Sequence, residues 1–210
     1  MFRPDAFDSL AEQLAELGRL LYARGWVFGT SGNFSAVLHE NPLSLAITAS
    51  GRDKGLLEPR DIVGIDRNGR VVYGSGHPSA EAALHLAIVR ARNAGAVLHT
   101  HSMWSTILSD ASEDGGLVVE GYEILKGLDG VPSHAHRERL PIIENTQDWA
   151  AAVPQVERLL RDHPEAHGFL IRRHGLYTWG RDLPEAKRHV EILEFLLEAM
   201  GRKRGMTWQP

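Results

Sequence analysis

The sequence contains no cysteine. This absence excludes disulfide bonds, a thiolate nucleophile and cysteine-ligated zinc, so histidine and carboxylate side chains are the candidates for metal ligands. No apolar run approaches the roughly 18 residues of a membrane span, and we expect no membrane partner. The N-terminal residues Met1–Asp5 have no apolar signal core, which makes a cytoplasmic protein our expectation.

The sequence also has no excess of basic charge. It has 23 Lys and Arg against 27 Asp and Glu, a formal net charge of −4, which argues against general nucleic-acid binding. Hydrophobic residues make up 43% and charged residues 24%, as in a soluble globular protein with a sizeable core. No repeat or linker divides the 210 residues. We therefore predict one α/β domain over residues 1–210 with a mixed sheet.

The spacing of apolar residues and turn residues predicts helices that alternate with short strands. We expect helices over 6–24, from about Ser79 to Asn93, and over 102–108, 149–161 and 182–200. We expect strands from Phe34 and from Ala96, and over 45–48, 62–65, 71–73, 117–119, 141–144 and 169–176. The last of these strands ends in His174 and Gly175 and continues past a turn at 177–179. Residues 129–140 are polar and loop-like, and the pattern does not fix the structure of 121–127.

Two histidines, His99 and His101, follow the apolar residues 96–98. Alternate side chains of a strand project from the same face, so both imidazoles would point in one direction, which favours a metal site. His174 ends another predicted strand and precedes Gly175, which lets another group approach closely. The second His-x-His pair, His134 and His136, follows Pro132 without apolar flanks, and we interpret it as surface loop.

Two turns of small residues lie at strand ends. The first contains Gly29, Thr30, Ser31, Gly32 and Asn33, and the second contains Ser50 and Gly51, followed by Arg52 and Lys54. Backbone N–H groups and hydroxyls of such turns can surround a phosphate, although a plain turn is the alternative. Neither turn matches a P-loop or a dinucleotide fingerprint, so a nucleotide cofactor is not expected.

Five motifs together resemble the class II aldolase family, which includes sugar-phosphate aldolases, an epimerase and a dehydratase. The motifs are Thr-Ser-Gly-Asn-Phe-Ser at 30–35, Thr-Ala-Ser-Gly at 48–51, Pro-Ser-Ala-Glu at 78–81, His-Thr-His at 99–101 and Arg-His-Gly at 173–175. The resemblance implies an α/β/α fold with a central mixed, largely antiparallel sheet. It also implies one divalent metal per subunit, usually Zn²⁺, on His99, His101 and His174, and a homotetramer with active sites between subunits.

Three further segments, 121–127, 140–146 and 171–180, resemble the dehydratase branch of this family, whose substrate is a methylthiopentulose 1-phosphate. In that reaction a metal coordinates the oxygens on C2 and C3 and makes the C3 proton more acidic. A carboxylate then removes this proton and helps the C4 hydroxyl leave as water. The resemblance makes Glu123 the carboxylate. Glu81 stands where the aldolases carry their catalytic acid, so it is a rival base or a group that supports the metal ligands.

The same resemblance predicts the phosphate site of the phosphorylated ketose. The predicted residues are Ser31, Gly32, Asn33, Ser50, Gly51, Ser79 at a helix start, and Lys54 as the counter-charge. Arg172 and Arg173 are adjacent on a predicted strand, so only one of them can face the site.

Two alternatives remain open. An aldolase or 4-epimerase acting on a pentulose or fuculose phosphate would share the metal chemistry but would break the C3–C4 bond; segments 121–127 and 140–146 favour dehydration. Cytoskeletal relatives use the fold as a non-catalytic interaction module without the ligands. The presence of all three histidines here favours an enzyme.

Overall fold

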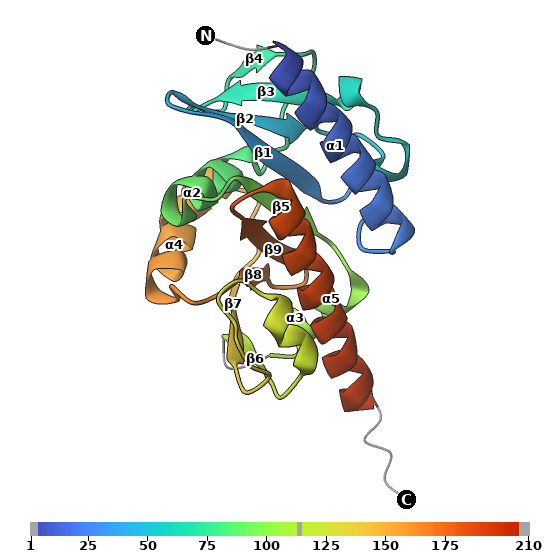
Figure 1. Ribbon diagram of the computed structural model, residues 1–210, viewed down its shortest axis with the longest axis vertical. Helices are drawn as coiled ribbons and strands as arrows, with labels where there is room; N and C mark the ends of the chain where they lie inside the picture. The colour runs from blue at the N-terminus through green and yellow to red at the C-terminus, as the bar shows by residue number, and fades with distance from the viewer. Residues whose placement is uncertain (1–3, 113–114, 206–210) are drawn as a thin grey trace, which may run out of the picture.

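The computed structural model describes residues 4–112 and 115–205. Within these residues nine strands form one sheet in the order β4-β3-β2-β1-β5-β9-β8-β7-β6 (Figure 1). Every neighbouring pair is antiparallel except β7 and β8, which are parallel. The predicted α/β fold with a mixed, largely antiparallel sheet is confirmed.

The elements follow the predicted order. The strands are β1 (Asn33–Glu40), β2 (Leu43–Thr48), β3 (Ile62–Asp66), β4 (Val71–Tyr73), β5 (Ala96–Thr100), β6 (Gly116–Glu120), β7 (Arg137–Ile143), β8 (Gly168–Ile171) and β9 (Gly175–Gly180). The α-helices are α1 (Pro4–Ala23), α2 (Ala82–Arg92), α3 (Met103–Asp110), α4 (Trp149–Asp162) and α5 (Leu183–Gly205). Short 3₁₀ helices are η1 (Lys54–Leu56), η2 (Pro59–Asp61) and η3 (Glu123–Gly127).

Helices cover both faces of the sheet, and each face has its own apolar core. Residues of α1, α3 and α5 pack with one set of strand residues, which includes Leu98 of β5. Residues of α2 and α4 pack with the other set, which includes Val97. Side chains alternate along a strand, so His99 lies on the same face as Val97, the face covered by α2. The strand period thus directs His99 towards the start of α2.

Several boundaries differ from the sequence prediction, and three of them lie near residues discussed below. Helix α2 begins at Ala82 instead of near Ser79, and Glu81 is its N-cap residue. The strand predicted to end at His174 and Gly175 ends at Ile171, because residues 172–174 form a turn in which Arg173 has a φ of 55°, and the predicted continuation at 177–179 belongs to β9. Strand β7 begins at Arg137, inside the segment predicted to be a loop.

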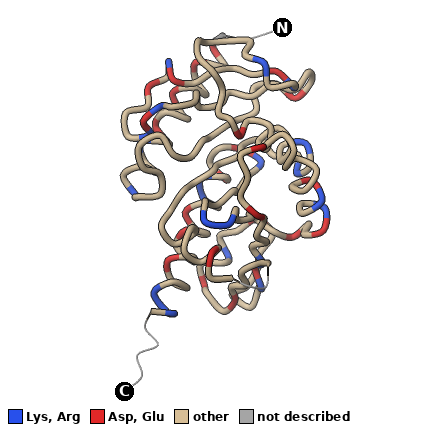
Figure 2. Tube along the Cα trace, turned by 180° about the vertical axis from the view of Figure 1, so that it is seen from behind, with Lys and Arg blue, Asp and Glu red and all other residues tan. Residues whose placement is uncertain are grey.

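Charged residues of both signs are spread along the chain, and Figure 2 shows basic and acidic positions interspersed over the molecule. No helix in the described part of the chain is long and apolar enough to cross a membrane.

Candidate metal centre

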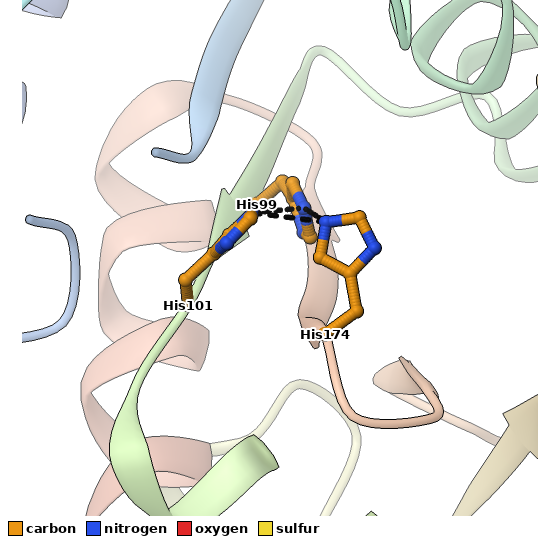
Figure 3. Close-up of side chains that lie close together, drawn as sticks. All are labelled: His99, His101 and His174. Atoms are coloured by element: carbon orange, nitrogen blue, oxygen red, sulfur yellow. Dashed lines mark hydrogen bonds between the residues drawn. The ribbon is translucent and has the colours of Figure 1, made fainter. Parts of the chain in front are cut away.

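Three imidazoles converge at the ends of β5 and β8. The Nε2 atom of His101 lies 2.8 Å from Nε2 of His99 and 3.1 Å from Nε2 of His174, and the third pair is 3.3 Å apart (Figure 3). His99 lies within β5, whereas His101 and His174 lie just beyond the ends of strands. The structure therefore brings together the three histidines that the sequence predicts as metal ligands.

Backbone contacts hold the two histidines that lie outside strands. The backbone N–H of His101 donates to the carbonyl of Trp26 at 2.8 Å. The carbonyl of His174 accepts from the hydroxyl of Thr106 on α3 at 3.2 Å. Helix α3 begins at Met103, and the Ser102 side chain caps it by accepting from the backbone N–H of Ser105. The carbonyl of Trp26 thus holds the backbone of His101, and Thr106 of α3 holds that of His174.

The hydrogen bonds on the far side of two rings determine which nitrogens carry protons. Nδ1 of His99 donates to the carbonyl of Leu176 at 2.9 Å, and Nδ1 of His174 donates to Oδ1 of Asn145 at 3.2 Å. In the neutral rings the Nε2 atoms then present lone pairs to one another. Such an outer hydrogen bond is usual for a metal-bound histidine.

Burial keeps these rings neutral. Burial, together with the neighbouring imidazoles, lowers the pKa of His101 to about 2 and holds the pKa of His99 well below its ordinary value. Burial also lowers the pKa of His174. Neutral imidazoles are the form that ligates metals, and converging lone pairs need a cation between them, so this donor set fits a divalent metal.

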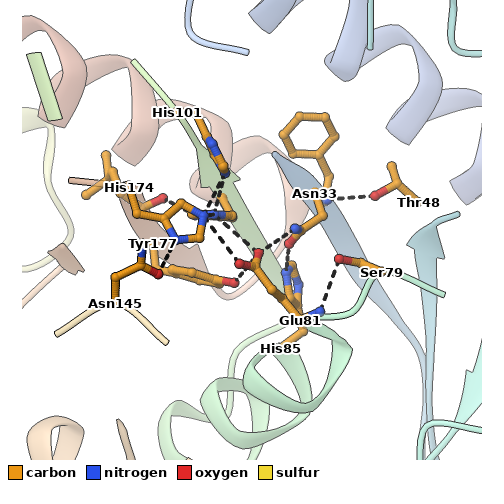
Figure 4. A network of polar contacts seen from close by, with 12 residues as sticks. Asn33, Thr48, Ser79, Glu81, His85, His101, Asn145, His174 and Tyr177 are labelled. Atoms are coloured by element: carbon orange, nitrogen blue, oxygen red, sulfur yellow. Dashed lines mark hydrogen bonds and ion pairs between the residues drawn. The ribbon is translucent and has the colours of Figure 1, made fainter. Parts of the chain in front are cut away.

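Glu81 lies beside the three histidines. Its Oε2 atom is 3.3 Å from Nε2 of His99, and its Oε1 atom is 3.4 Å from Nε2 of His174. Oε2 accepts hydrogen bonds from Nδ2 of Asn33 at 2.7 Å and from the hydroxyl of Tyr177 at 2.9 Å (Figure 4). Burial, with Glu81 nearby, raises the pKa of the Tyr177 hydroxyl well above its ordinary value, so it stays a donor.

Further buried polar residues, which contact Asn33, extend this network. His85, one helical turn after Glu81 on α2, contacts Oδ1 of Asn33 through Nε2 and the Ser35 hydroxyl through Nδ1. Burial lowers the pKa of His85 to about 4, so this ring is neutral at neutral pH. The chain of contacts from Ser35 to Glu81 fixes the amide of Asn33.

A cavity of about 240 Å³ opens next to the histidines. All seven residues predicted for the phosphate site line it, together with Glu81, His101 and His174: Ser31, Gly32, Asn33, Ser50, Gly51, Lys54 and Ser79. The turn at Gly32 requires glycine, because φ is +75° and an added Cβ would lie 2.7 Å from the carbonyl oxygen of His99. The first small-residue turn thus lies directly against the metal-ligand strand.

Lys54 joins the two turns of this cavity. Its side chain is buried, and Nζ donates to the carbonyls of Thr30 at 3.0 Å and Arg52 at 2.8 Å. Burial lowers the pKa of Lys54 to about 8, although Asp53 and Asp61 oppose this. A buried ammonium at the edge of a cavity gains from a bound anion, as the predicted counter-charge requires.

Other predicted residues lie apart from the histidines. Glu123 is on the surface at the start of η3, where its side chain is 72% exposed and Lys126 donates to it at 2.7 Å. Neither Arg172 nor Arg173 lines the cavity: Arg172 donates to the carbonyl of Ser109 at the end of α3, and Arg173 pairs with Asp110. The two arginines lie in the turn at 172–174 and not on a strand, so the predicted strand alternation does not apply to them.

The sequence analysis did not identify two residues that hold the centre in place. The Tyr177 ring stacks on His99 with ring centres 4.0 Å apart, and Asn145 orients His174. Asn145 lies in segment 140–146, whose resemblance to the dehydratase branch was the available signal. The position of Tyr177 follows from the pairing of His99 with Tyr177 across β5 and β9, which the sequence does not reveal.

Comparison with known proteins agrees with this geometry. The family profile described as "Class II Aldolase and Adducin N-terminal domain" matches residues 12–200. The chain belongs to this family. Methylthioribulose-1-phosphate dehydratase of Sorangium cellulosum is 43% identical over 205 residues, which cover 96% of each chain. The enzyme of that name from Alcanivorax borkumensis is 45% identical over 192 residues, 91% of this chain and 90% of the relative.

Solved structures of class II aldolase-like proteins have the same fold. YgbL of Escherichia coli, described as a putative aldolase/epimerase/decarboxylase, superposes with a TM-score of 0.76 at 25% identity, over 92% of this chain and 89% of YgbL. An L-fuculose 1-phosphate aldolase superposes with a TM-score of 0.76 at 22% identity, over 99% and 90% of the two chains. At such low identity the likeness to the aldolase concerns the fold alone.

Proposed function

We propose that this class II aldolase family member is a hydro-lyase that converts 5-methylthioribulose 1-phosphate to 2,3-diketo-5-methylthiopentyl 1-phosphate and water, a step of methionine salvage. The observation that carries the proposal is the convergence of His99, His101 and His174 beside a cavity lined by the predicted phosphate residues. Relatives 40–45% identical over most of the chain are methylthioribulose-1-phosphate dehydratases, which supports this substrate.

The three histidines are the proposed ligands of one divalent metal, which we propose to be Zn²⁺. When bound, the metal would polarise the oxygens on C2 and C3 of the ketose and make the C3 proton more acidic. The protein's part is to keep the three imidazoles neutral by burial and to orient them through the carbonyl of Leu176 and the amide of Asn145.

We propose different roles for the two glutamates. Oε2 of Glu81 already accepts hydrogen bonds from Asn33 and Tyr177, and both its oxygens face ligand histidines. These contacts suit a group that positions the ligands. Glu123 is exposed, and the hydrogen bond from Lys126 lowers its pKa, so it is a carboxylate at neutral pH and able to accept a proton.

In the proposed reaction Glu123 removes the proton from C3 and returns it to the C4 hydroxyl, which leaves as water. The C3–H and C4–O bonds break, a C3–C4 double bond forms, and the resulting enol tautomerises to the 2,3-diketone. Because Glu123 does not line the cavity of its own chain, this role requires that Glu123 act in the site of a neighbouring subunit. A homotetramer with sites at subunit interfaces meets that requirement and stays a prediction, as does a cytoplasmic location.

The phosphate of the substrate is proposed to lie on the turns at Ser31–Asn33 and Ser50–Gly51, near Ser79 and the ammonium of Lys54. Gln147 and Trp149, which belong to the segment that precedes and starts α4, also line this cavity.

Incubation of purified protein with 5-methylthioribulose 1-phosphate tests this function. We expect the 2,3-diketo product, and we expect the His99→Ala, His101→Ala double variant to lose activity and the metal of the three-histidine centre. Two cleaved fragments in place of the diketone would make the protein an aldolase. Full activity and full metal content in the double variant would contradict the proposed centre.

A further inference from the structure

A second group of metal-ligating side chains lies at the other end of β8. His136 directly precedes β7, Glu138 is the second residue of that strand, and His167 directly precedes β8, whereas His174 follows the end of β8. Oε2 of Glu138 lies 2.8 Å from Nε2 of His136 and 2.9 Å from Nδ1 of His167. The three donor atoms lie within 4.8 Å of one another. This cluster takes no part in the proposed dehydration.

The carboxylate of Glu138 is buried and needs a positive partner. Its side chain is 1% exposed, and its ion-pair partners among the described residues are the two imidazoles. Oε1 accepts the backbone N–H of His167 at 2.9 Å, which turns Oε2 towards both rings. A buried carboxylate is costly unless a cation compensates it, so the positive charge must come from a proton on an imidazole or from a bound ion.

The outer hydrogen bond of His167 has the pattern found at the first centre. Nε2 of His167 donates to the carbonyl of Asp129 at 2.8 Å, as Nδ1 of His99 donates to the carbonyl of Leu176. In the neutral ring Nδ1 of His167 then carries a lone pair that faces Oε2 of Glu138. Two facing lone pairs 2.9 Å apart require a cation, and a backbone carbonyl behind a histidine is the usual support of a metal ligand.

We propose that Nε2 of His136, Oε2 of Glu138 and Nδ1 of His167 form a second divalent-metal site. Two imidazoles and one carboxylate are a donor set that binds zinc with a position left open for water. A cavity of about 410 Å³ borders the cluster and gives an ion access to it. A metal there would tie the segment from Asp129 to His136, which leads from η3 into β7, to the start of β8.

The charges around this cavity do not oppose a cation at Glu138. Asp129, Glu165 and Glu185 face the cavity together with Arg92 and Arg181. Arg181 pairs with Glu185 at 3.1 Å, and Arg92 donates to the carbonyls of His163 and Pro164. His189 accepts the backbone N–H of Asp129 and donates to the carbonyl of Trp179, which makes it a neutral ring.

Metal content separates this site from the first. Full-length protein stripped with a chelator and equilibrated with Zn²⁺ should bind two equivalents per chain by elemental analysis. His136→Ala, a substitution of a partly exposed ligand, should bind one, and the His99→Ala, His101→Ala double variant should also bind one. The three substitutions together should leave none. His134→Ala, in the same segment but outside the cluster, is the matched control and should keep two.

A second measurement uses stability instead of stoichiometry. Zn²⁺ should raise the unfolding temperature of the His99→Ala, His101→Ala variant, and adding His136→Ala should abolish that rise. One equivalent in the wild type that disappears in the double variant would overturn the proposal and make the cation at Glu138 a proton. Two equivalents that persist in His136→Ala would also overturn it. Neither result bears on the dehydratase assay, which reports on the first centre alone.

Discussion

Glu81 and Glu123 both stand at the start of a helix, yet their surroundings suit opposite tasks. The Glu81 side chain is 8% exposed and touches two ligand histidines, whereas that of Glu123 is 72% exposed and touches Lys126 and His134. A carboxylate with both oxygens engaged holds its neighbours in place. An exposed carboxylate remains available to a substrate that another subunit presents.

The first prediction separates these roles. Glu123→Gln, which keeps the size of the side chain but cannot take up the proton, should lower kcat by about 10²–10⁴-fold while the metal stays bound. Exchange of the C3 proton with solvent deuterium should fall in parallel. Glu81→Gln should lower activity less and act through the ligands, with a loss of roughly 10–100-fold in metal affinity. If Glu81→Gln abolishes C3 exchange and Glu123→Gln preserves it, the base is Glu81.

The second prediction concerns the phosphate end of the cavity. Ser50→Ala removes one hydroxyl that lines the cavity and should raise KM by roughly 10- to 100-fold, the effect of one hydrogen bond to a charged group, with little change in kcat. The dephosphorylated ketose should be a very poor substrate. Ser9→Ala on the outer surface of α1 is the control and should leave KM unchanged. A dephosphorylated ketose that reacts as well as the substrate would refute the phosphate assignment.

For single residues, the sequence predicts the proposed ligands of metal and phosphate better than it predicts the residues that hold those ligands in place. The three histidines and the residues of the two turns stand next to strand ends, where their local sequence context is visible. Tyr177 and Asn145 act through stacking on His99 and a hydrogen bond to His174. Those contacts depend on strand register and on the path of a loop, which local sequence does not specify.

Among the elements, the pairing of β5 with β9 decides the shape of the metal centre. Gly175 opens β9 directly after His174, and an added Cβ there would lie 2.0 Å from the carbonyl oxygen of Thr100 and 3.0 Å from Cε1 of His99. The close approach expected at Gly175 from the sequence is confirmed. This close approach goes with the 3.3 Å distance between Nε2 of His99 and Nε2 of His174, which suits ligation of one cation.

The third prediction follows from that contact. Gly175→Ala should separate β9 from β5 at the centre, lower the free energy of unfolding by roughly 1–3 kcal/mol, and weaken Zn²⁺ binding. Denaturant unfolding and metal titration measure the two effects. Gly205→Ala, at the end of α5 with no atom within 4 Å of the added Cβ, is the control and should change neither. Normal zinc affinity in Gly175→Ala would show that the close approach is not needed for ligation.

The first residues of β7 have the pattern of a loop in the sequence, because the inward-pointing residue Glu138 is charged. Glu138 and Leu140 are buried on one face of β7, but a glutamate at the first of these positions hides the alternating pattern. Its partners, His136 and His167, are 31 positions apart in the sequence, so the local sequence does not indicate that both contact Glu138. Burial alone would raise the pKa of Glu138, but the contacts with His167 lower it overall.

The fourth prediction uses this pair in metal-free protein. Burial opposes the charge on His167, but the hydrogen bond to Glu138 raises the pKa of His167 overall. The protonated imidazole therefore stabilises the fold fully below about pH 6.5, and this stabilisation is lost as the pH rises through the raised pKa of His167. The effect of Glu138 is present above about pH 4.5 and is lost as the pH falls through its lowered value. His167→Gln should therefore cost about 3–5 kcal/mol between these limits. A difference from wild type that grows above pH 7 in denaturant unfolding would contradict it.

For the molecule as a whole, the position of η3 limits what Glu123 can reach. Leu125 and Leu128, which follow Glu123, are buried in the core beneath α5, and an added Cβ on Gly127 would lie 2.5 Å from Ile192 of that helix. Glu123 is therefore held on the surface by a packed segment and does not line the cavity beside the histidines. The fold of one chain separates the proposed base from the proposed metal, so the role proposed for Glu123 depends on a second chain.

The last prediction tests that union with mixed oligomers. Glu123→Gln and the His99→Ala, His101→Ala variant should each be nearly inactive alone. Co-expressed with two different tags and purified through both, they should regain activity, because about one quarter of randomly assorted sites combine an intact histidine cluster with an intact Glu123. The matched control pairs the same double variant with Glu81→Gln. Glu81 contacts His99 and His174 of its own chain, so every intact cluster in that mixture carries the Gln substitution, and activity should stay at the Glu81→Gln level or below. A doubly tagged complex of the first pair without recovered activity would place the function of Glu123 within its own chain or outside catalysis.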